Sequence, residues 1–128
     1  MRVLIDTHLL LWAAGDPDRL PTAALTEIEN PDNVLMFSAA SIWEVTIKNG
    51  LGRSDFTVDS ALLRRGLLDN GYEELPIRGQ HAVFAGRLPR LHKDPFDRIL
   101  VAQSLVEGAA LLTSDELVAH YHQSIRLV

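Results

Sequence analysis

The sequence predicts a single α/β domain over residues 1–128, with a mostly parallel central sheet flanked by helices. Three observations support this prediction. The length of 128 residues is that of one ordinary domain. Hydrophobic residues make up 47% and charged residues 23%, which is typical of a soluble globular protein. Short apolar runs alternate with helical patterns along the whole chain, without repeats or a linker, and this alternation favours parallel strands joined by helices.

The expected strands are short apolar runs bounded by turn residues or helix-capping residues. The first, RVLID, ends in an acid, and the stretch GAALLTSD contains another strand that does the same. The expected strands therefore cover residues 2–6, 34–38, 72–77, part of 108–115, and 124–128.

The expected helices lie between these strands. Within residues 58–71, apolar side chains recur at a spacing of three to four, as in an amphipathic helix. Ser38 is a suitable N-cap and Gly50 a suitable stop for the helix between them. The full set of expected helices covers residues 7–15, 22–30, 39–50, 58–71, 78–86, 94–107 and 116–121.

The composition excludes several classes of protein. The apolar stretch LLLWAA is too short to span a bilayer and follows no basic segment, so we expect a cytoplasmic protein without a membrane partner. The absence of cysteine excludes disulfides and thiolate metal sites. The five histidines show no compact spacing such as HExxH, which argues against a zinc site. A net charge of −5 argues against tight nucleic-acid binding over a broad surface, but not against a small basic patch working with a bound cation.

Several acids have structural explanations when each is taken singly. Asp6 and Asp115 each sit where a strand gives way to a helix, and aspartate is a favoured N-cap because its oxygens accept unpaired backbone N–H groups. Glu44 lies four residues before Lys48, which suits an ion pair on a helix surface.

The segment HKDPFDRILVAQ allows a similar explanation. Asp94 fits as the N-cap, Pro95 as the first helical residue and Asp97 as the third, where a carboxylate meets the positive end of the helix. The neighbours of Asp97 one turn further on are Leu100 and Val101, which belong to the apolar face. A carboxylate on that face loses solvation unless a positive charge compensates it.

Taken together, the acids suggest a metal site. Ligands of parallel sheets bind outside the carboxyl ends of the strands, where Asp6 and Asp115 are expected. If Glu44 and Asp97 lie in the first turns of nearby helices, four carboxylates approach one point. Like charges so gathered repel or take up protons unless a cation holds them together. Mg²⁺ or Mn²⁺ is the cation that suits oxygen ligands.

Four segments, IDTHLLLW, SAASIWEV, LPRLHKDPFDRILVAQ and LLTSDE, together resemble the PIN domain family. More narrowly, they resemble the VapC-type ribonuclease toxins of prokaryotic toxin–antitoxin pairs. The resemblance covers essentially the whole chain and implies a parallel sheet flanked by helices with an acidic pocket that binds Mg²⁺ or Mn²⁺. By position, the family's acids match Asp6, Glu44, Asp97 and Asp115, of which the fourth is the least uniform in the family.

The resemblance implies further site features and partners. The polar Thr or Ser near the family's site matches Thr7, Thr113 or Ser114 only loosely, and it leaves the role of Asp94 open. VapC-type proteins typically form homodimers and are silenced by a cognate antitoxin encoded beside them.

Such a site would support metal-assisted hydrolysis of RNA phosphodiesters. Asp6, Asp97 and Asp115 are then expected ligands, and Glu44 is either a ligand or a group that orients the attacking water. One or two metal ions fit equally well. Attack by water does not need the 2′-hydroxyl, so a preference for RNA must come from binding.

Basic residues precede and adjoin Asp97. RLPRLHK supplies Arg87, Arg90, His92 and Lys93, and Arg98 follows Asp97 directly. As a cluster beside the expected site they favour RNA binding, with Arg90, Lys93 and Arg98 as the predicted contacts. Each taken singly is explained equally well as an ordinary solvated charge.

Apolar residues near the start of two helices invite two interpretations. Trp12 and Trp43, together with Leu9, Leu10 and Leu11, are expected in the core. One helix face cannot bury four consecutive large residues, so part of this surface is also a candidate site for an antitoxin helix or a dimer interface.

Two other functions remain in view. A phosphoacceptor receiver domain is a similar α/β domain, but this chain lacks adjacent acids after its first strand, and Asp55 does not end an apolar strand. A PIN-like binding module that has lost activity and works through a protein partner is the stronger alternative. Loss of an acid would favour it, and none is missing at the matched positions.

Overall fold

The computed structural model describes residues 1–51 and 57–128, so Asp55 lies outside the described residues. Over these residues the chain forms a five-stranded sheet whose strands are all parallel, in the order β3-β2-β1-β4-β5. The strands are β1 (Arg2–Ile5), β2 (Val34–Ser38), β3 (Glu73–Leu75), β4 (Ala110–Thr113) and β5 (Arg126–Leu127). The first strand of the sequence is thus the central strand of the sheet.

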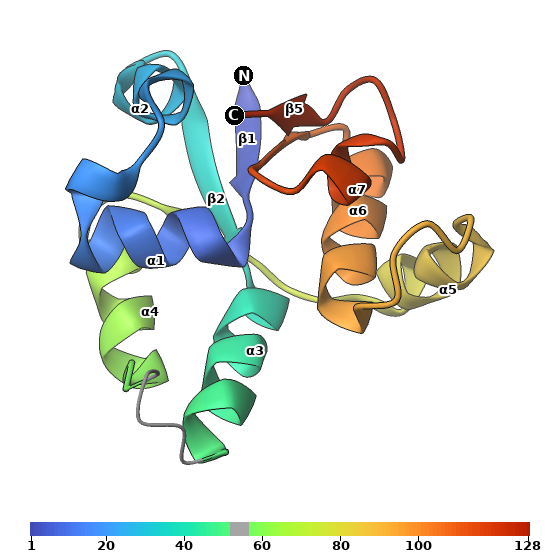
Figure 1. Cartoon of the computed structure of the whole chain (residues 1–128), viewed down its shortest axis with the longest axis horizontal. Helices are drawn as coiled ribbons and strands as arrows, with labels where there is room; N and C mark the ends of the chain where they lie inside the picture. Colours follow the sequence, from blue (N-terminus) through green and yellow to red (C-terminus); the bar gives the residue numbers. More distant parts are fainter. Residues whose placement is uncertain (52–56) are drawn as a thin grey trace.

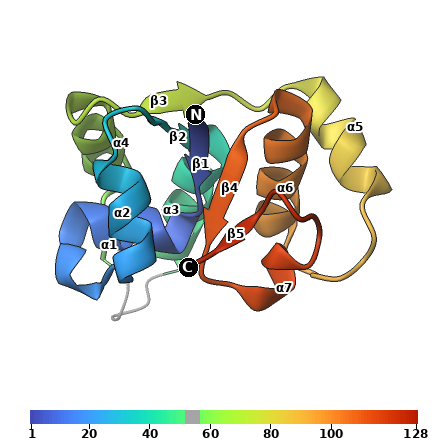
Figure 2. The ribbon, with the colours of Figure 1, turned by 90° about the horizontal axis from the view of Figure 1, so that it is seen from above.

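Helices connect the strands and cover both faces of the sheet (Figures 1 and 2), with α1, α2 and α4 on one side and α5 and α6 on the other. They are α1 (Thr7–Gly15), α2 (Thr22–Glu29), α3 (Ala39–Gly50), α4 (Ser60–Asp69), α5 (Gly79–Arg87), α6 (Pro95–Glu107) and α7 (Glu116–Ala119), with a short 3₁₀ helix at Pro17–Arg19. The predicted single α/β domain with a parallel sheet is confirmed. The 3₁₀ helix was not predicted, because DPDRLP indicates only an interruption of the chain.

The core consists of two apolar clusters, one on each face of the sheet. Successive side chains of a strand point to opposite faces, so Val3 and Ile5 pack with α1, α2 and α4, whereas Leu4 packs with α6 and α7. All three of these side chains are fully buried. Burying a large aliphatic side chain contributes about 1.5–3 kcal/mol, so β1 anchors both halves of the domain.

Polar side chains cap several helices, and three of these helices, α1, α3 and α7, begin at the carboxyl end of a strand. Asp6 caps α1 by accepting from the backbone N–H of Leu9, and Ser38 caps α3 by accepting from that of Ala40. Asp94 caps α6, with Pro95 as its first residue, and Asp115 caps α7. The capping explanation is therefore correct for Asp6, Asp94 and Asp115, and it does not exclude a second role.

The prediction for the two tryptophans is only partly correct. Leu9 and Leu10 are fully buried and Trp12 packs partly against the core, but Trp43 is 59% exposed. The buried face of α3 is formed by Ala40, Ser41, Glu44 and Val45, and Trp43 lies on the opposite face. Across residues 1–51 and 57–128, every helix is too short or too polar to cross a lipid bilayer.

Candidate metal-dependent active site

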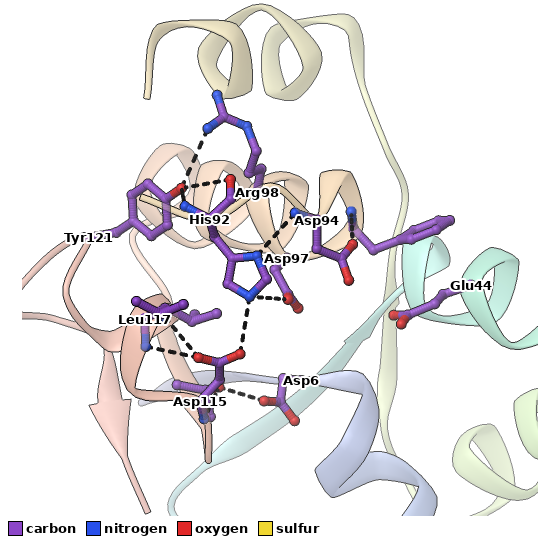
Figure 3. A network of polar contacts seen from close by, with 12 residues as sticks. Asp6, Glu44, His92, Asp94, Asp97, Arg98, Asp115, Leu117 and Tyr121 are labelled. Atoms are coloured by element: carbon purple, nitrogen blue, oxygen red, sulfur yellow. Dashed lines mark hydrogen bonds and ion pairs between the residues drawn. The ribbon is translucent and has the colours of Figure 1, made fainter. Parts of the chain in front are cut away.

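The four predicted acids approach one another at the carboxyl edge of the sheet (Figure 3). Asp6 directly follows β1 and Asp115 lies two residues after β4, the neighbouring strand. Asp97 lies in the first turn of α6, whereas Glu44 lies in the second turn of α3, not in the first. All four line one pocket of about 210 Å³, together with Thr7, His8, Lys48, His92, Asp94 and Ser114.

Asp6 is the most firmly held of the acids. It is 7% exposed, and its Oδ1 accepts from the Leu9 N–H at 3.0 Å while its Oδ2 accepts from the Thr113 hydroxyl at 2.6 Å. Burial raises the pKa of this carboxyl, although the hydrogen bonds from Thr113 and Leu9 work in the opposite direction. Each oxygen keeps a further lone pair for a cation.

Glu44 carries an unsatisfied oxygen. The residue is 5% exposed, and its Oε2 accepts from Lys48 Nζ at 2.6 Å, as the spacing of the two residues predicts. Its Oε1 is buried and has no hydrogen-bond partner among the described residues. An unpaired buried acceptor costs about 1–3 kcal/mol, and a cation in the pocket would offset that cost. The residues present therefore fit a divalent ion.

The surroundings of Asp97 disfavour the ionised form of its carboxyl group. Burial and then the neighbouring charge of Asp94, with smaller contributions from Glu44 and Asp6, raise the pKa of Asp97 to about 7, whereas His92 works in the opposite direction. Such a raised pKa is expected when carboxylates share a site without a counter-ion. On the following turn of α6, Leu100 and Val101 are buried, as the apolar pattern predicts.

Asp115 is in a different environment at the rim of the pocket. Its Oδ1 accepts from the N–H of Leu117 at 2.8 Å and its Oδ2 bonds His92 Nε2 at 3.1 Å. Burial alone would raise the pKa of Asp115, but the hydrogen bonds from His92, Leu117 and Val118 together hold it below its ordinary value. Asp115 therefore stays ionised at neutral pH.

His92 also lies in this cluster, and the sequence indicates its place there only in part. Its Nε2 lies 3.2 Å from Asp97 Oδ2 and 3.1 Å from Asp115 Oδ2, and these three side chains are close enough to share an ion. From the sequence, His92 was one of several basic residues before Asp97. Its position two residues before Asp94 is the feature of the sequence that points to a place near the site. The sequence does not show, however, how the loop before α6 directs the ring toward Asp115.

The basic residues differ in their surroundings. Arg90 and Lys93 are exposed on the segment between α5 and α6. Arg98 instead donates to the backbone carbonyls of Ala85 at 2.7 Å and Pro89 at 3.1 Å, so it fixes this segment to α6. A contact between any of the three and a substrate stays a prediction.

The smaller polar residues near the site have distinct partners. Thr113 bonds Asp6, whereas the Thr7 hydroxyl donates to Ser41 at 2.9 Å and Ser114 is exposed. Asp94 accepts from the Phe96 N–H at 2.8 Å and also lines the pocket. Of Thr7, Thr113 and Ser114, Thr113 is thus the one whose hydroxyl bonds the side chain of one of the four acids.

Comparison with known proteins identifies the family. The model of the PIN domain matches residues 3–122. The chain belongs to the PIN domain family. Among curated proteins, this PIN domain is similar to Ribonuclease VapC22 of Mycobacterium tuberculosis, with 30% identity over 122 residues that cover 94% of this chain and 92% of that protein.

Solved structures support the same fold. VapBC2 from Rickettsia felis, bound to a DNA fragment from its promoter, matches with a TM-score of 0.72 at 14% identity, covering all of this PIN domain and 98% of that chain. VapBC-1 from nontypeable Haemophilus influenzae matches with a TM-score of 0.64 at 15% identity, covering 100% and 97% of the two chains. The resemblance to the VapC-type family predicted from the four sequence segments is therefore confirmed.

Proposed function

We propose that this PIN domain protein is a metal-dependent endoribonuclease that acts in the cytoplasm as the toxin of a type II toxin–antitoxin pair. One observation carries the chemical part of the proposal. Four carboxylates from separate elements line one pocket, and the buried Oε1 of Glu44 in that pocket has no hydrogen-bond partner within residues 1–51 and 57–128. The similarity to Ribonuclease VapC22 supports RNA as the substrate.

The ion in this proposal is Mg²⁺ or Mn²⁺, because the available donors are carboxylate oxygens. Asp6, Asp97 and Asp115 would hold it directly or through water, and Glu44 would either hold it or orient the attacking water. A bound divalent ion supplies charge neutralisation at the phosphate and lowers the pKa of a bound water.

The surrounding residues prepare these acids for that role. The hydrogen bonds from Leu9 and Thr113 to Asp6, and from Leu117 to Asp115, fix both carboxylates before any ligand arrives. Lys48 lines the pocket and neutralises one oxygen of Glu44, so the other oxygen is free to act on the ion or on water. Fixed donors and acceptors reduce the reorganisation needed during the reaction.

Arg90 and Lys93 would bind the RNA backbone beside this pocket. Both are exposed on the segment that leads into Asp94 and Asp97. We assign Arg98 a supporting role in the same segment, because its guanidinium is engaged by backbone carbonyls. The preference for RNA rests on such contacts, because hydrolysis by water does not require the 2′-hydroxyl.

The protein partners in this proposal are a cognate antitoxin and a second copy of the chain. The structural neighbours include VapBC complexes from two bacteria, which supports an antitoxin partner. Trp43 and Ile47 of α3 and its C-cap residue Leu51 form an exposed apolar stripe, and Leu62 of α4 is 63% exposed. Such a stripe is typical of a surface that another protein covers.

Cleavage of a mixed RNA pool in Mn²⁺ tests the proposal. The wild type, checked by mass spectrometry for absence of bound antitoxin, is compared with Asp97→Asn and with Asp69→Asn as the matched control at the exposed end of α4. We expect cleavage by the wild type and by Asp69→Asn, and at least a 100-fold loss for Asp97→Asn with an unchanged or higher melting temperature.

The alternative is a catalytically inactive PIN-like binding module that acts through a protein partner. It is favoured if purified wild type free of antitoxin leaves RNA intact. Equal cleavage by the wild type and Asp97→Asn would instead remove Asp97 from the chemistry.

A further inference from the structure

His92 stands between two acids that come from different elements (Figure 3). It lies on the segment between α5 and α6, whereas Asp97 belongs to α6 and Asp115 precedes α7. Its Nε2 bonds Asp115 Oδ2 at 3.1 Å and lies 3.2 Å from Asp97 Oδ2. One ring nitrogen therefore contacts two carboxylates of the proposed metal site.

The other ring nitrogen determines what Nε2 can do. The backbone N–H of Asp94 donates to His92 Nδ1 at 3.0 Å, so Nδ1 is an acceptor and carries no hydrogen. The imidazole must then carry its hydrogen on Nε2, which makes Nε2 a donor toward the carboxylates. A nitrogen in that state has no lone pair for a metal ion, so the geometry does not favour direct ligation by His92.

The ring is held in place from several directions. The N–H of His92 donates to the Tyr121 hydroxyl at 2.9 Å, which ties this segment to the chain after α7. Arg98 binds the carbonyls of Ala85 and Pro89, which ties the same segment to α6. A donor supported in this way can orient a carboxylate as well as neutralise part of its charge.

We propose that His92 is a positioning residue of the metal site, whose Nε2–H orients Asp115 and keeps it beside Asp97 without binding the ion itself. This inference rests on the proposed metal-dependent function. It assigns to the HKDPFD segment a third task, besides starting α6 and supplying Asp97.

Mn²⁺ titration by calorimetry, without RNA, tests this role. We compare the wild type with His92→Phe, which keeps the ring shape but loses the donor, and with His92→Gln, whose amide keeps an N–H donor. His122→Gln is the matched control, because His122 is exposed and bonds Ser124 instead. Far-ultraviolet circular dichroism and melting temperature establish that each variant is folded.

We expect His92→Phe to bind Mn²⁺ about 10-fold or more weakly, as is typical when a group that orients a metal ligand is removed. His92→Gln should recover most of the affinity, and His122→Gln should bind like the wild type. Equal binding by the wild type and His92→Phe, or no recovery in His92→Gln, would overturn the positioning role while leaving the nuclease proposal intact.

Electron spin echo spectroscopy of the Mn²⁺-loaded wild type separates positioning from ligation. We expect no modulation from a directly bound histidine nitrogen. A ¹⁴N signal that disappears in His92→Gln would overturn the proposal in favour of direct ligation. A wild type that binds no Mn²⁺ would overturn both the metal site and the role of His92 in it.

Discussion

The hydroxyl of Thr113 joins two of the four acids at the carboxyl edge of the sheet. It donates to Asp6 Oδ2 at 2.6 Å and accepts from the backbone N–H of Asp115 at 3.1 Å. Thr113 is fully buried at the end of β4, so water cannot replace either bond. The geometry at the centre of the site therefore depends on a residue that is not itself an acid.

Thr113→Val should destabilise the protein by about 1–3 kcal/mol, because it leaves a buried oxygen of Asp6 without a donor. It should also raise the pKa of Asp6 further, since the Thr113 hydrogen bond works against the effect of burial. Chemical denaturation measures the loss of stability. Thr113→Ser keeps the hydroxyl and serves as the control. If Thr113→Ser lost as much stability as Thr113→Val, the methyl group of Thr113, and not its hydroxyl, would account for the stabilisation.

Without metal, the stability of the protein should fall as the pH rises from about 4 to about 7. Folded Asp97, with its pKa raised to about 7, keeps its proton over most of this range, whereas the unfolded chain loses it near 3.8. The unfolded state then binds fewer protons, so the free energy of unfolding decreases with pH.

Asp97→Asn has no carboxyl group at this position. Comparing it with the wild type therefore separates the contribution of Asp97 to the pH dependence of stability from the contributions of the other acids. In EDTA, its melting temperature should match the wild type near pH 4 and exceed it increasingly up to pH 7, with a constant difference above. Saturating Mn²⁺ should reduce that difference. Parallel profiles for the two proteins from pH 4 to 8 would contradict this account.

Lys48→Met should destabilise the metal-free protein by about 1–3 kcal/mol, because it leaves Glu44 as a buried carboxylate with no side-chain partner in the part of the chain that the structure describes. The double variant Glu44→Gln with Lys48→Met should recover most of that loss. Denaturant titrations of the two single variants and the double variant measure the coupling. If the changes in the free energy of unfolding of the two single variants add up to that of the double variant, the Glu44–Lys48 ion pair contributes nothing to stability.

Arg90→Ala with Lys93→Ala should weaken RNA binding and flatten its dependence on salt. In a plot of the logarithm of the binding constant against the logarithm of the salt concentration, each phosphate contact to single-stranded RNA contributes about 0.7 to the magnitude of the slope. The slope of the double variant should therefore be smaller in magnitude by about 1.4. Fluorescence anisotropy with inactive Asp97→Asn as the background measures both values. Arg65→Ala, an exposed arginine on α4, is the control. An unchanged slope would exclude both residues as phosphate contacts.

Local patterns predict most of this fold because its strands are short apolar runs and its helices have recognisable caps. The convergence of Asp6 and Asp115 also follows from the sequence, since neighbouring parallel strands end at the same edge. The same side chains that cap helices also line the pocket, so the structural and the chemical explanations do not compete.

What the sequence does not predict depends on the path of irregular segments and on the rotation of helices. The approach of His92 to Asp115 joins residues 23 positions apart and depends on the course of the segment before α6. The orientation of Arg98 toward carbonyls has the same origin. Trp43 is exposed because packing selects which face of α3 is buried, and hydrophobicity alone does not identify that face.

The central position of β1 also determines when the site forms during synthesis. Asp6 leaves the ribosome early, but the Thr113 hydroxyl that it bonds comes 107 positions later on β4, two residues before the last of the four site acids. Until β4 pairs with β1, the early acids have no common pocket. A polypeptide still attached to its own message therefore holds a dispersed set of carboxylates, and the proposed ribonuclease site is complete only when the newly made chain has closed its sheet.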